Sequence, residues 1–273
     1  METDPFRIRG HVADFDAIVA EIVEASARTR DRLPMVPNVP YGESASETVD
    51  IFFPEGSRQN LPVHMFIHGG YWRMFSKKDY SYVADTVTRA GAIAVIVDYA
   101  LMPGVRMDVL VDQVRAAKRW VLERISSYGG DPACLSISGH SAGAHLASFL
   151  FHRGDTKSDV GAALLLSGIF DLEPLQKSFL QAEIAITDEE VAAFSPLTHT
   201  HDESCHVVVA VGADETPPFH RQANEFASSL EKQGRTVVRR AIGRANHMSS
   251  VRDLGIAGTA AAEILSDVIA RSL

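Results

Sequence analysis

The sequence lacks several features that would assign it to a broad class of proteins. It has only two cysteines in 273 residues, Cys134 and Cys205, and each adjoins a predicted buried strand. We therefore interpret them as small apolar residues rather than as a disulfide or a metal site. Acidic residues outnumber basic ones, and the resulting formal charge of −9 disfavours nucleic acid and anionic membrane surfaces as partners. The longest apolar runs, such as Ile93–Val97, are too short to span a bilayer.

Targeting and linker signals are also missing. The first residues, Met1 to Pro5, are acidic and lack the basic start and apolar stretch of a secretory signal, so we expect a cytoplasmic protein. No Pro-, Gly- or Ser-rich stretch divides the chain, which predicts a single domain over residues 1–273, with residues 1–40 as a helical extension. The oligomeric state has no sequence signal, and a homodimer is expected only because dimers are common.

The hydrophobic pattern changes near Tyr41. Apolar residues before it recur at helical spacing from about Asp14 to Leu33. After it, short apolar runs alternate with amphipathic segments, which is typical of an α/β fold with a mostly parallel sheet and helices on both faces. The expected strands are 48–53, 63–67, 93–97, 135–138, 162–166, 207–211 and 236–242. The expected helices are 78–90, 107–125, 142–152, 219–233 and 256–270, with Gly91 and Gly234 ending two of them. Residues from about 170 to 205 have no strand character and predict a small cap of short helices above the sheet.

The most informative motif is Gly139-His-Ser-Ala-Gly143, which lies between an apolar strand and an apolar helix. In such a G-x-S-x-G turn the serine occupies a strained corner, and the flanking glycines avoid a collision between strand and helix. The turn exposes the serine hydroxyl at the start of the helix. Ser141 is therefore the predicted nucleophile.

A serine nucleophile needs a base and an acid that orients the base. In hydrolases with this turn the acid follows the serine in the chain and the histidine comes last, each after a strand. Asp214 follows the predicted strand that ends near residue 211, and His247 follows the last predicted strand. We assign these two residues as acid and base. The competing acids are Glu215 and Asp171, and the competing base is His220.

The sequence His68-Gly-Gly-Tyr-Trp72 follows another predicted strand. Glycines let backbone N–H groups turn into a site without side chains blocking the substrate, and a developing oxyanion needs such donors. Gly69, Gly70 and Tyr71, together with Ala142, are the predicted oxyanion hole. The predicted substrate pocket is formed by aromatic residues and one histidine near these motifs, namely Trp72, Phe75, His140, Phe170 and Phe219.

Histidines also gather near residue 200, where His199, His201, Asp202 and His206 resemble a metal cluster. No further cysteine or carboxylate at a suitable spacing completes a ligand set, so we predict no metal and no cofactor.

Taken in order, these motifs resemble those of α/β-hydrolases of the arylformamidase (kynurenine formamidase) and related esterase group. The similarity covers roughly Tyr41 to the carboxyl terminus. It implies an α/β-hydrolase fold and a cofactor-free serine hydrolase that acts on a small ester or an aryl-formamide such as N-formylkynurenine. The alternatives are a general short-acyl carboxylesterase and, from another class, a non-catalytic receptor or scaffold of the same fold.

Overall fold

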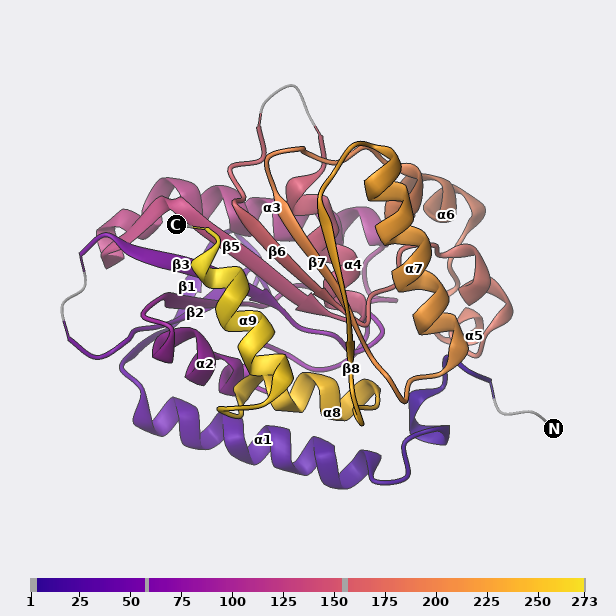
Figure 1. Ribbon diagram of the computed structural model, residues 1–273, viewed down its shortest axis with the longest axis horizontal. Helices are drawn as coiled ribbons and strands as arrows, with labels where there is room; N and C mark the ends of the chain where they lie inside the picture. The colour runs from indigo at the N-terminus through magenta and orange to yellow at the C-terminus, as the bar shows by residue number, and fades with distance from the viewer. Residues whose placement is uncertain (1–3, 57–58, 154–156, 273) are drawn as a thin grey trace.

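The computed structural model describes residues 4–56, 59–153 and 157–272, which form an α/β structure around one large sheet (Figure 1). Within these residues the sheet has eight strands in the order β1-β2-β4-β3-β5-β6-β7-β8. The first two pairings, β1 with β2 and β2 with β4, are antiparallel, and all others are parallel. The strands are β1 (Met35–Pro40), β2 (Thr48–Phe52), β3 (Leu61–Ile67), β4 (Ile93–Val97), β5 (Gly130–His140), β6 (Ala162–Leu166), β7 (His206–Gly212) and β8 (Val237–Ile242).

All seven predicted strands are present, and the mostly parallel sheet is confirmed. The central strands are apolar without alternation because helices cover both of their faces. In β4 and β6 every residue is buried. The parallel arrangement brings the carboxyl ends of β3, β5, β7 and β8 to the same edge of the sheet. We call the loops that follow these four strands the strand-end loops.

Strand β1 was not predicted, because Pro37 and Pro40 argue against a strand in this segment. The structure accommodates them at the edge of the sheet, where one side of the strand needs no hydrogen-bonded neighbour. Asn38 has a φ of 55° and lies where the pairing with β2 shifts register, between Val36 and Val39. An irregular edge strand of this kind carries little sequence signal.

Helices flank the sheet on both sides, and α9 lies in front of the strands in Figure 1 while α3 and α4 lie behind them. Gly91 and Gly234 follow α2 and α7 with φ near +80°, as predicted for helix ends. None of the described helices is long and apolar enough to cross a membrane. The main helices are α1 (Phe15–Arg32), α2 (Ala84–Arg89), α3 (Met107–Arg124), α4 (Ala142–Ser148), α7 (Pro217–Lys232), α8 (His247–Arg252) and α9 (Ala260–Ala270).

The segment between β6 and β7 consists of short helices, as predicted for the cap. They are the 3-10 helix Glu173–Lys177, α5 (Gln181–Ile184), α6 (Asp188–Phe194) and the 3-10 helix Pro196–Thr198. Residues 4–10, which precede α1, pass beside α5 at one side of the molecule (Figure 1). We call residues 4–12 and 169–200 together the cover, because side chains from both stretches line a cavity together with Ser141.

Candidate active site

Ser141 occupies the corner between β5 and α4, with φ 55° and ψ −118°. Such left-handed backbone is unfavourable for a serine and is typical of functional sites. A Cβ at Gly143 would come within 2.1 Å of the Ile67 carbonyl oxygen, and one at Gly139 within 2.3 Å of the Gly143 oxygen. Both positions therefore require glycine. The Ser141 N–H donates to the Leu166 carbonyl at 2.9 Å, which ties the corner to β6.

The acid beside His247 is Glu215 and not Asp214. His247 Nδ1 lies 2.7 Å from Glu215 Oε2, and the Glu215 carboxylate is fully enclosed. Its other oxygen, Oε1, accepts hydrogen bonds from the Ser167 hydroxyl and from the Gly212 N–H. Because carboxylate oxygens only accept, Nδ1 is the nitrogen that donates, and in the neutral tautomer that fits this bond Nε2 is the acceptor.

Our assignment of Asp214 as this acid was wrong, for a physical reason. Asp214 is exposed at the turn after β7, where its backbone N–H donates to the Ala245 carbonyl. The turn directs the next side chain, that of Glu215, inward, and the longer glutamate reaches the imidazole. The other candidate acid, Asp171, caps its own turn by accepting from the Glu173 N–H.

His247 is the first residue of α8, a helix that was not predicted from the sequence. The Asn246 side chain accepts from the N–H groups of Met248 and Ser249 and fixes the start of this helix. His140, which precedes Ser141, donates from Nε2 to the His247 carbonyl at 3.0 Å, and the two rings lie 4.5 Å apart. Burial, followed by the proximity of His247, lowers the pKa of His140 well below its usual value, so His140 is neutral.

The turn after β3 is strained over several residues. Gly70 has a φ of 110°, and Tyr71 and Trp72 have φ values of 55° and 60°. Consecutive residues in unusual conformations cluster at ligand-binding sites, where surrounding contacts hold them. A Cβ at Gly69 would lie 3.4 Å from the Ser141 Cβ, so this turn lies directly against the Ser141 corner.

Trp72 is fixed by a histidine from α4. Its indole N–H donates to His145 Nδ1 at 3.1 Å, and His145 Nε2 donates to the Phe194 carbonyl of the cover at 2.7 Å. Burial lowers the pKa of His145 to about 4. The neutral ring can therefore accept at one nitrogen and donate at the other.

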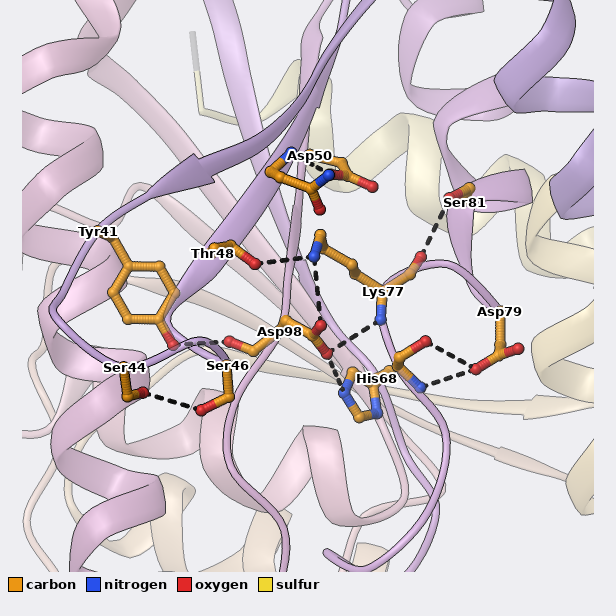
Figure 2. Close-up of polar contacts among 12 residues, drawn as sticks. Tyr41, Ser44, Ser46, Thr48, Asp50, His68, Lys77, Asp79, Ser81 and Asp98 are labelled. Atoms are coloured by element: carbon orange, nitrogen blue, oxygen red, sulfur yellow. Dashed lines mark hydrogen bonds and ion pairs between the residues drawn. The ribbon is translucent and has the colours of Figure 1, made fainter.

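A polar cluster lies behind the same turn (Figure 2). His68 Nδ1 donates to the Gly69 carbonyl at 2.8 Å, while its Nε2 faces Asp98 Oδ1 at 3.4 Å. Lys77 Nζ lies 3.3 Å from the other Asp98 oxygen and donates to Thr48 Oγ1 at 2.8 Å. Burial raises the pKa of the Asp98 carboxyl, but the contact with His68 and the charges of His68 and Lys77 outweigh it and lower the pKa overall. A carboxylate thus holds His68 in place under the turn.

A small cavity adjoins Ser141. It leaves about 10 Å³ for the centre of a water-sized molecule, which is room for about one water. Its apolar lining comes from the turn after β3, from α7 and from the cover. The lining residues are Phe6, Tyr71, Trp72, Ser141, Ala142, Ile169, Leu175, Leu180 and Phe219.

The predicted pocket residues divide into two groups. Trp72 and Phe219 line the cavity beside Ser141, whereas Phe75, His140 and Phe170 do not. Phe170 is buried and stacks on Phe226 at a centroid distance of 4.1 Å, which makes it a core residue. Phe75 packs edge-on against Tyr80.

The residues that the cover contributes to this cavity were not predicted from the sequence as pocket residues. Phe6 precedes the first predicted helix and belongs to no motif, and Ile169, Leu175 and Leu180 are apolar residues in a segment without clear periodicity. Nothing but their apolar character could have identified them, because they reach Ser141 only through the tertiary fold.

Two members of the predicted cluster near residue 200, His199 and Asp202, have polar partners within the protein. His199 Nδ1 lies 3.1 Å from His152 Nε2, and Asp202 accepts hydrogen bonds from the Ser158 and Ser204 N–H groups. In the stretches that the structure covers, no group of three or more histidine, cysteine or acidic side chains is arranged to hold a metal ion.

Comparison with known proteins agrees with this geometry. Residues 64–249 match the α/β hydrolase fold family. The kynurenine formamidase of Danio rerio is 32% identical over 247 residues, which cover 87% of this chain and 83% of the relative. Esterase LipQ of Mycobacterium tuberculosis is 27% identical over 76% of this chain and 58% of its own length. The solved structure of EstE1, a thermophilic carboxylesterase from a metagenomic library, has a TM-score of 0.71 at 18% identity and covers 95% of this chain and 96% of that chain. The resemblance inferred from the motifs is confirmed, and the chain belongs to the α/β hydrolase family as a hydrolase related to kynurenine formamidases and esterases.

Proposed function

We propose that this hydrolase cleaves a small ester or aryl-formamide bond through Ser141, His247 and Glu215. The observation that carries the proposal is the Glu215–His247 hydrogen bond of 2.7 Å. The His247 ring lies 4.4 Å from Phe219, which lines the same cavity as Ser141 with its left-handed backbone. Serine, histidine and an acid in this relation are the parts of an acyl-transfer site, whichever fold supplies them.

The proposed reaction starts with attack of Ser141 Oγ on the substrate carbonyl. His247 Nε2 accepts the serine proton as the new bond forms and returns it to the leaving group. Glu215 keeps the imidazole in the tautomer that this requires and stabilises the imidazolium. Water then attacks the acyl-enzyme with the help of the same base, which releases the acid and restores Ser141.

The oxyanion of each tetrahedral intermediate needs preorganised N–H donors. We assign this role to backbone N–H groups of Gly69, Gly70, Tyr71 and Ala142. The contact between Gly69 and the Ser141 corner supports the assignment, as does the strained backbone of the turn. No step requires a cofactor.

The acyl group of the preferred substrate is small. The cavity beside Ser141 has room for about one water, which suits a formyl or acetyl group better than a long chain. The relative named kynurenine formamidase covers more of this chain than the esterase LipQ and favours a formamide. We therefore rank an aryl-formamide such as N-formylkynurenine first and a short-acyl ester second.

A labelling experiment tests the nucleophile. The native protein should react with a fluorophosphonate probe, and the Ser141→Ala variant should not. The same variant should retain its circular dichroism spectrum and lose about 10⁴-fold or more in kcat/KM for p-nitrophenyl acetate. An unlabelled native protein would instead favour a non-catalytic receptor of this fold.

A second measurement separates the two substrate classes. We would compare kcat/KM for N-formylkynurenine and for p-nitrophenyl acetate under the same conditions. A value for the formamide at least as high as that for the activated ester supports a formamidase. A much lower value supports a general short-acyl esterase.

A further inference from the structure

Phe6, a residue from the amino-terminal end of the chain, forms part of the wall beside Ser141. Its side chain is buried, with 6% of the residue exposed, and lines the same cavity as Ser141. The Phe6 ring contacts Phe219 edge-on at 5.9 Å, and Phe219 in turn lies 4.4 Å from the His247 ring. Three rings from distant parts of the sequence thus form a continuous row that ends at His247.

The backbone around Phe6 is attached to the strained turn after β3. The Tyr71 hydroxyl donates to the Phe6 carbonyl at 2.9 Å and accepts from the Ile8 N–H at 3.0 Å. Both bonds depend on one side-chain oxygen. A single hydroxyl therefore holds residues 6–8 in place over the cavity.

The preceding residues have two further attachments. The Thr216 hydroxyl donates to the Pro5 carbonyl at 2.7 Å, and the Asp4 carboxylate accepts from the Phe179 N–H at 2.5 Å. Thr216 directly follows Glu215. The segment thus spans from the acid loop to the cover helices, and it is held by side chains rather than by the sheet.

The position of Phe6 places it near the leaving group of a bound substrate. Because His247 must return a proton to the leaving atom, the leaving group lies beside the imidazole. Phe219 occupies the space next to that ring, and Phe6 lies against Phe219. The room for about one water would already be filled by a formyl or acetyl group, so no space remains for an aromatic leaving group while Phe6 stays where it is.

On this basis, and assuming the function proposed above, we propose that Phe6 determines the size of leaving group that the enzyme accepts. Small leaving groups fit beside Phe219 with little displacement of the Phe6 ring. Large ones, which include the aromatic amine released from an aryl-formamide, require residues 4–10 to shift outward. The selectivity of the site is therefore set partly by a segment that precedes the first helix of the fold.

A second cavity lies on the other side of the same segment. It has a volume of about 330 Å³ and shares Tyr71 with the cavity beside Ser141. Its wall includes Arg7, Phe15 and Phe179, so residues 6 and 7 separate the two spaces. Outward movement of Phe6 would join them and provide the room that a bulky leaving group needs.

The test compares two acetate esters that differ only in the leaving group, ethyl acetate and 2-naphthyl acetate. The Phe6→Ala variant should raise the ratio of kcat/KM for the naphthyl ester to that for the ethyl ester by about 10-fold, because several ring carbons no longer compete with the substrate. Tyr71→Phe keeps the ring and removes both hydrogen bonds, so it should shift the ratio in the same direction by about 3-fold.

Val12→Ala is the matched control, because Val12 is a buried apolar residue of the same extension and lines neither of the two cavities. It should leave the ratio unchanged. If Phe6→Ala shifts the ratio less than 2-fold while Ser141 still reacts with the fluorophosphonate probe, the role of Phe6 is refuted and the proposed function stands. Loss of labelling in the native protein would refute the proposed function instead.

Discussion

The strand-end loops and the cover meet at Ser141 but are held by different kinds of contact. In the strand-end loops, polar side chains are fixed by buried hydrogen bonds, as Glu215 is by Ser167, Gly212 and His247. The cover contributes apolar side chains to the cavity, and Phe6 is attached through side chains of neighbouring segments. The residues proposed to do chemistry are thus positioned by the sheet, whereas those proposed to select substrates belong to segments outside it.

This difference has a consequence for substitutions. A change in the strand-end loops should lower the rate for every substrate, because it alters groups that act on the reacting bond. A change in the cover should alter the relative rates for different substrates, or the stability, with little effect on the chemistry. The following predictions test this distinction in order of expected effect.

The largest loss of activity is expected for a substitution of Glu215, the proposed acid. Glu215→Gln keeps the size of the side chain but presents an amide to His247, which can favour the wrong imidazole tautomer. We expect kcat to fall by about 10³- to 10⁴-fold with KM little changed. Steady-state kinetics with p-nitrophenyl acetate measures this effect.

The neighbouring residue provides the control. Asp214→Asn removes a carboxylate one position away that is exposed and lies outside the contact with His247. It should change kcat/KM by less than about 2-fold, because an exposed charge without a short contact is largely screened by water. Equal losses in the two variants would contradict the assignment of Glu215.

The same pair of residues shows what the sequence could and could not predict. The turn that carries Ser141, its two glycines and the loop after β7 could be located from the sequence, because these features depend on local sterics and on strand order. The choice between Asp214 and Glu215 depends on which side chain the turn after β7 directs inward. That direction depends on backbone pairing, such as the Asp214 N–H bond to Ala245, which spacing in the sequence does not encode.

The pocket was less predictable than the sheet for a related reason. Aromatic residues near a motif can line the site, as Trp72 does, or stack in the core, as Phe170 does on Phe226. Both positions carry a large aromatic residue, so the residue type alone does not show whether the side chain lines the site or lies in the core. Phe6 reaches the site from far away in sequence, so only the tertiary structure connects it with Ser141.

A smaller loss of activity is expected for a substitution in the polar cluster behind the turn after β3. Asp98→Asn removes the charge that faces His68 and Lys77, so the contact that supports the Gly69 carbonyl weakens. We expect about a 10-fold decrease in kcat with KM nearly unchanged, because the proposed oxyanion donors of this turn would act mainly in the transition state. An unchanged kcat in a folded variant would show that this cluster does not position the turn.

The pH dependence of the free energy of unfolding independently tests how much the Asp98 carboxylate contributes to stability. The pKa of Asp98 in the folded protein is lowered from 3.8, so its contribution is complete above that value and is lost as the pH falls through the folded pKa. Urea unfolding should therefore show Asp98→Asn to be less stable than the native protein at pH 7. The difference should shrink below about pH 4. A difference that stays constant across this range would mean that the lost stability does not come from the charge.

The smallest effect on activity is expected within the cover. Glu190 of α6 accepts hydrogen bonds from the Arg106 guanidinium and from the Met107 N–H, and Arg106 also donates to the Ile184 and Ala185 carbonyls. Glu190 is buried, with 8% of the residue exposed. This ion pair attaches the cover to the start of α3 and does not line the cavity beside Ser141.

Removing the charge of Glu190 should therefore affect stability more than catalysis. Glu190→Gln leaves the Arg106 charge without its partner, and we expect a loss of about 2 to 3 kcal/mol in the free energy of unfolding. The value of kcat/KM for p-nitrophenyl acetate should change by less than about 2-fold at a temperature where the variant is folded, because the strand-end loops are held by other contacts. Glu183→Gln is the matched control, since its pair with Arg73 is partly exposed and should contribute less than about 1 kcal/mol. A large loss of kcat in folded Glu190→Gln would show that the cover also positions the reacting groups, and the distinction between the two regions would then have to be abandoned.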